Sequence, residues 1–134
     1  MRVKISMIDR DLRAVGIVIR VVNGTFTERR LRVINRLMAK LPIRVKDDAL
    51  QTDERWLTRK DGSRLRLRLF RPRTAKANVP GVLWLHGGGY AIGVPERARS
   101  MAKRLILASD CVVIAPDYRL SLEAPYPAAL ADGY

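Results

Sequence analysis

Apolar residues recur at two different spacings along this 134-residue chain. Over about the first fifty residues they lie three and four positions apart, which is the spacing of one face of a helix. From residue 54 they alternate with polar residues, as in a strand that has one face buried. The pattern therefore predicts a helical region over residues 1–53 and a sheet-containing region over residues 54–134.

Two amphipathic helices are predicted in the first region. The first runs from about Ile8 to Val22 and stops at Asn23-Gly24. The second begins at Thr25-Phe26-Thr27-Glu28, which has the form of a capping box, and ends at Pro42, which cannot continue a helix. We interpret its apolar stripe as packing in a core or under a lid, with a membrane-binding face as the alternative. The stripe consists of Leu31, Ile34, Leu37, Met38 and Leu41.

A connector over residues 43–53 leads to a predicted antiparallel hairpin. Its strands are Arg55–Arg59 and Arg64–Phe70, and Gly62 in the turn Lys60–Ser63 is free to adopt a positive φ. Three leucines share one face of the second strand and three arginines share the other. The arginine row predicts the solvated face of an edge hairpin, with an anion-binding stripe as the alternative. These residues are Leu65, Leu67 and Leu69 on one face and Arg64, Arg66 and Arg68 on the other.

The last part of the chain has the pattern of a βαβ unit. Gly81–Leu85 is a short apolar run that predicts a strand buried on both faces, as in a parallel sheet. A helix is expected over Glu96–Ser109, and a second buried strand over Cys111–Ala115. The only cysteine, Cys111, is expected to be a small buried strand residue. Pro127 is well placed to begin a last helix that runs through Leu130.

A glycine triplet follows the first strand of this unit, in the sequence His86-Gly87-Gly88-Gly89-Tyr90. Consecutive glycines let the backbone approach a ligand closely and adopt angles that a side chain forbids. Such a loop can turn its N–H groups inward and form an oxyanion hole. A phosphate-binding role is discounted, because neither a Gly-Lys-Ser/Thr ending nor a G-x-G-x-x-G spacing is present.

Two motifs together carry a family resemblance. The first is His86-Gly87-Gly88-Gly89-Tyr90-Ala91-Ile92-Gly93, and the second is the stretch from Asp117-Tyr118-Arg119 to Pro127-Ala128-Ala129-Leu130-Ala131-Asp132. In this order, with a helix and a strand between them, they closely resemble the hormone-sensitive-lipase-like branch of the α/β-hydrolase fold. Ser121 and Leu122 stand where that family has Ala and Pro. The specific resemblance covers roughly residues 54–134, and residues 1–53 correspond to the variable N-terminal cap helices.

The resemblance implies a carboxylic ester hydrolase, either an esterase or a lipase, that acts on a small-molecule ester without a cofactor. A serine attacks the ester carbonyl, a histidine held by an acidic residue takes its proton, and the glycine loop stabilises the oxyanion. Carried over to this chain, His86 positions the loop, and the donors come from Gly87 and Gly88 or from Gly88 and Gly89. Tyr90 lines the mouth of the substrate pocket.

The resemblance also implies a structural motif after the second strand of the βαβ unit, formed by Asp117, Tyr118, Arg119 and Glu123. Arg119 and Glu123 are expected to form an ion pair that holds this loop. Asp117 is expected to act as a cap or turn acceptor at the strand end. Asp132 is expected to face its neighbours or solvent from the last helix.

The catalytic triad itself is not found in the sequence. No Gly-x-Ser-x-Gly occurs, and the only histidine, His86, lies upstream of the place where the family has its nucleophile elbow. We therefore expect an incomplete hydrolase domain that stops before this elbow and is inactive alone. The alternatives are a non-catalytic remnant or a basic binding module.

Charge is distributed unevenly. Residues 1–76 hold 21 Lys and Arg against 8 Asp and Glu, whereas residues 77–134 hold 5 of each. A basic region can bind nucleic acid or anionic lipid, but no nucleic-acid-binding motif accompanies it, so no nucleic-acid partner is expected. One histidine and one cysteine make no metal ligand set. No stretch has the length of a transmembrane segment, and the lack of disulfides fits the cytoplasm.

Overall fold

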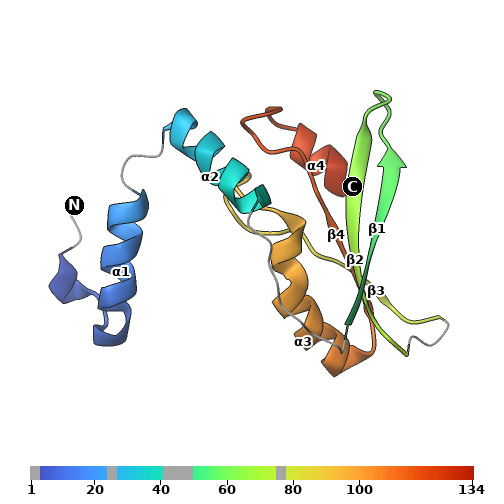
Figure 1. The fold of residues 1–134 in the computed structure, drawn as a ribbon, viewed down its shortest axis with the longest axis horizontal. Coiled ribbons are helices and arrows are strands. Elements are labelled where there is room, and N and C mark those ends of the chain that lie inside the picture. Colours follow the sequence, from blue (N-terminus) through green and yellow to red (C-terminus); the bar gives the residue numbers. More distant parts are fainter. Residues whose placement is uncertain (1–3, 24–26, 41–49, 75–77) are drawn as a thin grey trace.

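The computed structural model describes residues 4–23, 27–40, 50–74 and 78–134. Two N-terminal helices stand beside a four-stranded sheet, and α1 lies on the far side of α2 from the sheet (Figure 1). Two further helices pack against the sheet. In chain order the elements are η1 (Ile5–Met7), α1 (Arg10–Asn23), α2 (Glu28–Lys40), β1 (Leu50–Thr58), β2 (Arg64–Pro72), β3 (Gly81–Leu83), η2 (Pro95–Ala98), α3 (Arg99–Ser109), β4 (Val112–Pro116) and α4 (Ala128–Gly133).

The sheet is mixed, with the strand order β1-β2-β4-β3. β2 pairs antiparallel with both β1 and β4, whereas β3 pairs parallel with β4. The predicted βαβ unit is thus present, with α3 connecting its two parallel strands. The register aligns Phe70, Val113 and Val82 across three neighbouring strands, so these side chains lie on one face of the sheet.

The core lies between this face and α3. Phe70 and Val113 have at most 1% of their surface exposed, and Ala102 and Ile106 of α3 pack against them. The small residues of α3 let the helix approach the sheet closely, because Ala adds little volume between backbone and strand. Cys111 joins this cluster from the position just before β4, so its predicted burial is confirmed.

The opposite face of the sheet is covered far less. Leu83 of β3 and Leu85, which follows it, are each about half exposed. The end of α4 lies near Leu85, since a Cβ on Gly133 would be 3.4 Å from its side chain. The prediction of a strand buried on both faces is therefore wrong for these residues. β3 is an edge strand among the described elements, and α4 is too short to cover its outer face.

The hairpin forms where the alternating pattern predicted it. Gly62 adopts a φ of 82° in the turn, as expected. β1 begins at Leu50, so the connector expected over residues 43–53 is wrong for residues 50–53, while residues 43–49 lie outside the described part. The hairpin lies at the edge of the sheet, as predicted, with β2 as its inner strand. Arg66 and Arg68 of the arginine row are only partly exposed and pair with carboxylates, so the solvated face predicted for the row is wrong for these two residues.

The two N-terminal helices form close to their predicted positions. Thr27 caps α2, since its Oγ1 accepts a hydrogen bond from the backbone N–H of Arg30 at 3.4 Å. The first capping-box residue, Thr25, and the expected stop at Pro42 lie outside the described residues. No residue of α2 is fully buried, and Leu37 of its predicted stripe is exposed. The apolar spacing thus predicted the helices but overstated their burial.

Candidate functional site

The glycine loop between β3 and η2 makes a tight left-handed turn. Gly88, Gly89 and Tyr90 have φ values of 137°, 59° and 57°. The carbonyl oxygen of Gly88 closes the turn by accepting hydrogen bonds from the N–H groups of Ala91 and Ile92, each at 3.1 Å. A Cβ on Gly88 would overlap the carbonyl oxygen of Ile92, so glycine is required here for space as well as for angle.

The turn leaves several backbone donors free. Within the described structure, the N–H groups of Gly87, Gly88, Gly89 and Tyr90 donate no hydrogen bond to any protein group. Free donors in a constrained turn are typical of an anion-binding loop. Both pairs left open by the sequence, Gly87 with Gly88 and Gly88 with Gly89, are therefore available as donors.

His86 and Tyr118 form a buried support beneath the loop. Their rings stack with centroids 4.3 Å apart, and the Tyr118 hydroxyl donates to the carbonyl oxygen of His86 at 2.6 Å. Burial, with a smaller contribution from Tyr90, raises the pKa of Tyr118, so the hydroxyl keeps its proton and remains a donor. Nδ1 of His86 is then left to donate to the carbonyl oxygen of Gly87 at 3.1 Å. The structure therefore places His86 as a support of the loop.

The segment after β4 contacts the glycine loop from the other side. The backbone N–H of Ser121 donates to the carbonyl oxygen of Tyr90 at 2.7 Å. Between the loop, this segment and α4 lies a cavity of about 410 Å³ with a mainly apolar lining, and Tyr90 lies on its wall. The cavity is lined by Gly89, Tyr90, Ser121, Ala124, Tyr126, Ala129 and Leu130.

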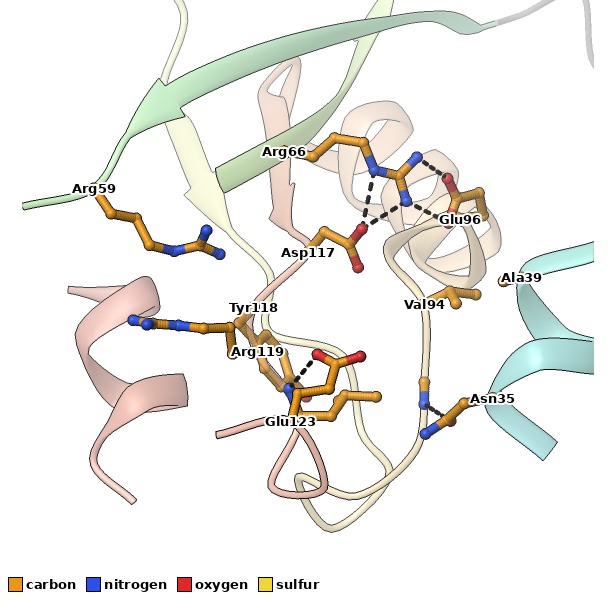
Figure 2. Close-up of a pocket in the computed structure, with 12 residues that line it drawn as sticks. Asn35, Ala39, Arg59, Arg66, Val94, Glu96, Asp117, Tyr118, Arg119 and Glu123 are labelled. Carbon is orange, nitrogen blue, oxygen red and sulfur yellow. Dashed lines mark hydrogen bonds and ion pairs between the residues drawn. The ribbon is translucent and has the colours of Figure 1, made fainter. Parts of the chain in front are cut away.

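Arg66 links three parts of the site through ion pairs. Its guanidinium contacts Glu96 of η2 at 2.7 Å and Asp117 at 2.8 Å, at the end of β4 (Figure 2). Burial alone lowers the pKa of Arg66, but the hydrogen bonds to Glu96 and Asp117 outweigh it and raise the pKa. Asp117 is thus an ion-pair partner, which corrects the cap or turn role expected for it. Because η2 follows the glycine loop, the pairs tie the end of that loop to the sheet.

Asp132 of α4 is held by two arginines and a backbone donor. Its side chain is 1% exposed and accepts from Arg59 at 2.7 Å, from Arg119 at 2.9 Å and from the N–H of Arg119 at 2.8 Å. Burial by itself raises the pKa of Asp132, but these hydrogen bonds prevail and lower it. Of the two positions expected for Asp132, toward its neighbours or toward solvent, the structure shows the first.

The expected ion pair between Arg119 and Glu123 is also wrong. Arg119 pairs with Asp132 and, at 3.2 Å, with Asp61 of the hairpin turn. Glu123 instead accepts a weak hydrogen bond from the backbone N–H of Leu120, three residues before it. A buried carboxylate gives an arginine a less screened partner than an exposed one does. The short sequence separation of Arg119 and Glu123 was the misleading signal.

Two side chains of α2 reach this site and were missed by the sequence analysis. Asn35 donates from Nδ2 to the carbonyl oxygen of Ala91 at 2.8 Å, and its Oδ1 accepts from the N–H of Gly93 at 3.4 Å. Arg32 donates to the carbonyl oxygen of Leu122 at 3.1 Å. One signal was available, because Asn35 is a polar residue on the face of the half-buried stripe.

The described residues contain no group of three or more His, Cys, Asp or Glu side chains arranged to hold a metal ion. None of the helices in this part of the chain is long and apolar enough to cross a membrane.

Comparisons with known proteins agree with this geometry. Residues 82–134 match the model of a family described by the alpha/beta hydrolase fold. Esterase LipI of Mycobacterium tuberculosis is 36% identical over 69 residues, or 50% of this chain and 22% of that protein. The gibberellin receptor GID1A of Arabidopsis thaliana is 38% identical over 58 residues, or 42% of this chain and 17% of the receptor. The structure of a bacterial heroin esterase superposes with a TM-score of 0.76 at 24% identity, covering 97% of this chain and 41% of that one.

These similarities extend over part of each relative. The chain spans about a fifth of the length of the curated relatives and about two fifths of the solved esterase chains. The predicted fold class, an α/β arrangement with a hairpin followed by a βαβ unit, is confirmed by the mixed sheet and by the superposition. The chain therefore has an α/β-hydrolase fold, residues 82–134 match the model of that family, and the curated proteins similar to this part of the chain include an esterase.

Proposed function

We propose that this chain supplies the oxyanion-stabilising part of a carboxylic ester hydrolase. The supporting observation is that the glycine loop, Gly88 and Gly89 included, keeps N–H groups without a protein partner in a left-handed turn beside the buried pair of His86 and Tyr118. Donors fixed in this way need no reorganisation when negative charge develops on the substrate oxygen. Each such donor contributes about 3–4 kcal/mol of transition-state stabilisation in well-studied hydrolases.

The proposed reaction is acyl transfer through a serine nucleophile. The serine oxygen attacks the ester carbonyl carbon, its proton passes to a histidine base, and the carbonyl oxygen becomes an oxyanion facing Gly88 and Gly89. When the tetrahedral intermediate collapses, the alcohol leaves with that proton, and water then releases the acid by the same steps. Tyr90 borders the apolar cavity beside the loop, which suits the hydrocarbon part of an ester.

Nucleophile and base have no counterpart among these 134 residues. The sequence has no Gly-x-Ser-x-Gly, and its only histidine, His86, is engaged beneath the loop. We therefore propose that the 134-residue polypeptide by itself does not turn over esters. Incubation of the purified chain with short p-nitrophenyl esters should give no hydrolysis above buffer. Turnover that a serine-directed phosphonate abolishes would contradict this.

A chimera tests the proposed function directly. Residues 1–134 replace the matching N-terminal part of esterase LipI, so that the relative supplies the remaining chain. We expect hydrolysis of p-nitrophenyl butyrate by the chimera. Gly88→Ala should reduce kcat about 100-fold or more, because it displaces an oxyanion donor. Gly62→Ala is the matched control, since Gly62 also has a positive φ but lies in the hairpin turn. Loss of kcat in both variants, or in neither, would contradict the proposed role of the loop.

A binding role without catalysis is the second candidate. One protein similar to this chain is named as a receptor, and the chain itself has no base for acyl transfer. A folded chimera that has no esterase activity would favour this candidate. The basic N-terminal region would then be examined first, by measuring binding to DNA and to anionic vesicles at increasing salt, since electrostatic binding weakens steeply with ionic strength.

A further inference from the structure

We propose that Asn35 is a positioning residue for the glycine loop and that α2 acts as a brace for the oxyanion hole. The inference rests on the proposed function of the loop. Asn35 does not touch the reacting atoms; it acts through the backbone of residues 91–93. None of the sequence motifs that carry the family resemblance contains this residue.

The side-chain amide of Asn35 forms hydrogen bonds with the loop at two points. Its amide nitrogen donates to the carbonyl oxygen of Ala91 at 2.8 Å, and its amide oxygen accepts from the N–H of Gly93 at 3.4 Å. The two loop groups are two residues apart, so one planar side chain fixes the peptide units on both sides of Ile92. An amide is suited to this task because it carries a donor and an acceptor together.

The gripped segment directly follows the oxyanion turn. The N–H groups of Ala91 and Ile92 both donate to the carbonyl oxygen of Gly88, so a shift of residues 91–93 moves Gly88 as well. Gly93 has a φ of 136°, and a Cβ there would overlap the ring of His86. The grip therefore holds the loop against its buried support and keeps the turn closed.

A second contact of α2 reinforces the brace. Arg32, one turn before Asn35, donates to the carbonyl oxygen of Leu122. The neighbouring Ser121 in turn donates from its backbone to Tyr90 of the glycine loop. Helix α2 thus makes hydrogen bonds to both segments that border the apolar cavity.

Helix propensity opposes an asparagine at this position. Within a helix Asn is less favourable than Ala by about 0.6 kcal/mol. If Asn35 affected only α2, its replacement by alanine would therefore stabilise the helix. If Asn35 positions the glycine loop, the same replacement should loosen that loop. The opposite signs separate the proposed role from a local structural one.

Amide hydrogen exchange of the 134-residue chain tests the grip without any need for activity. In Asn35→Ala we expect the amides of Ala91, Ile92 and Gly93 to exchange about 2- to 10-fold faster, the effect of losing one net hydrogen bond. Amides within α2 should not accelerate. Asn35→Asp keeps the shape but replaces the donor by an oxygen that faces the carbonyl of Ala91, so it should also loosen the loop. Arg36→Ala, an exposed neighbour, is the matched control.

Kinetics of the chimera with LipI test the consequence. Because a misplacement of about 1 Å can cost about 100-fold in rate, we expect Asn35→Ala and Asn35→Asp to lower kcat about 10-fold or more while KM stays within about twofold. If Asn35→Asp kept the wild-type exchange rates of residues 91–93 and the wild-type kcat, the proposal would be overturned. The packing of a side chain of this size would then be enough to position the loop. An inactive parent chimera would reject the proposed function, while the exchange experiment would still decide whether Asn35 holds the loop.

Discussion

The N-terminal helices and the sheet region differ in how their apolar residues are used. Both regions have regular apolar spacing, but only the sheet region buries it. Phe70 and Val113 are enclosed between sheet and α3, whereas apolar residues of α1 such as Leu12 and Val18 are about 60% exposed. The difference shows that periodicity selects the type of element, while burial requires a second element of matching shape.

The attachment of the helices differs in the same way. α3 is held by apolar contacts with Phe70 and Val113. By contrast, no residue of α2 is fully buried, and its Asn35 and Arg32 side chains form hydrogen bonds with backbone groups of the loops. α3 therefore depends on apolar burial more than α2 does. The predictions below test this contrast between the two regions.

The largest effect is expected in the core of the sheet region. Phe70→Ala removes a fully buried ring and should lower the free energy of unfolding by about 3–5 kcal/mol, because the cavity cannot collapse completely. Urea denaturation followed by circular dichroism measures it. Leu107→Ala, on the exposed side of α3, should cost under about 1 kcal/mol and serves as the control. Equal losses in the two variants would show that the core is not where the structure places it.

Asp132→Ala should have the next largest effect. The substitution leaves Arg59 and Arg119 facing each other without their shared carboxylate, and breaking a buried pair costs about 3 kcal/mol. The same denaturation experiment measures it. Asp11→Ala, in the exposed first turn of α1, should cost about 0.5 kcal/mol from the helix dipole. If Asp11→Ala were the more damaging variant, the contrast between the two regions would be refuted.

Stability should also fall at acid pH through the same carboxylate. The pKa of Asp132 is lowered in the folded state, so its contribution is fully present above the unfolded pKa, near 4, and is lost as the pH falls through the folded value. The hydrogen bonds with Ser63 lower the pKa of Asp61, so its protonation at acid pH should also reduce stability. Denaturation of wild type and Asp132→Asn between pH 7 and 2.5 tests this. The asparagine variant should show a weaker pH dependence, and parallel curves would exclude Asp132 as a source.

The smallest effect is expected in α1. Leu12→Ser changes a side chain that is already more than half exposed and should alter the free energy of unfolding by at most about 0.5 kcal/mol. Its circular dichroism spectrum should retain the helical signal. A loss of 2 kcal/mol or more in urea would mean that this face of α1 is buried in solution, and the comparison between the two regions would then need revision.

Local features of the chain could be predicted because they depend on short-range physics. The spacing of apolar residues predicted α1 and α2, the alternation of leucine and arginine predicted β2, and Gly62 predicted the hairpin turn. The glycine triplet predicted a loop with backbone angles that a side chain forbids, and Gly88 and Gly89 have positive φ values. Each of these depends on residues that are neighbours in sequence.

Partnerships between distant residues could not be predicted in this way. Arg119 was expected to pair with Glu123, four residues away, but pairs with Asp132 because α4 brings a buried carboxylate to it. Arg66 was expected to face solvent, yet Glu96 and Asp117 converge on it from two other elements.

The sequence by itself therefore determined the type and order of most elements, the fold class and the glycine loop of this protein. Only the tertiary structure decided which charges pair, which face of the sheet is covered and that Asn35 of α2 grips the loop. The physical reason is that hydrogen bonds and ion pairs act over a few ångströms, and residues 35 and 91 are brought within that range only by the folded chain.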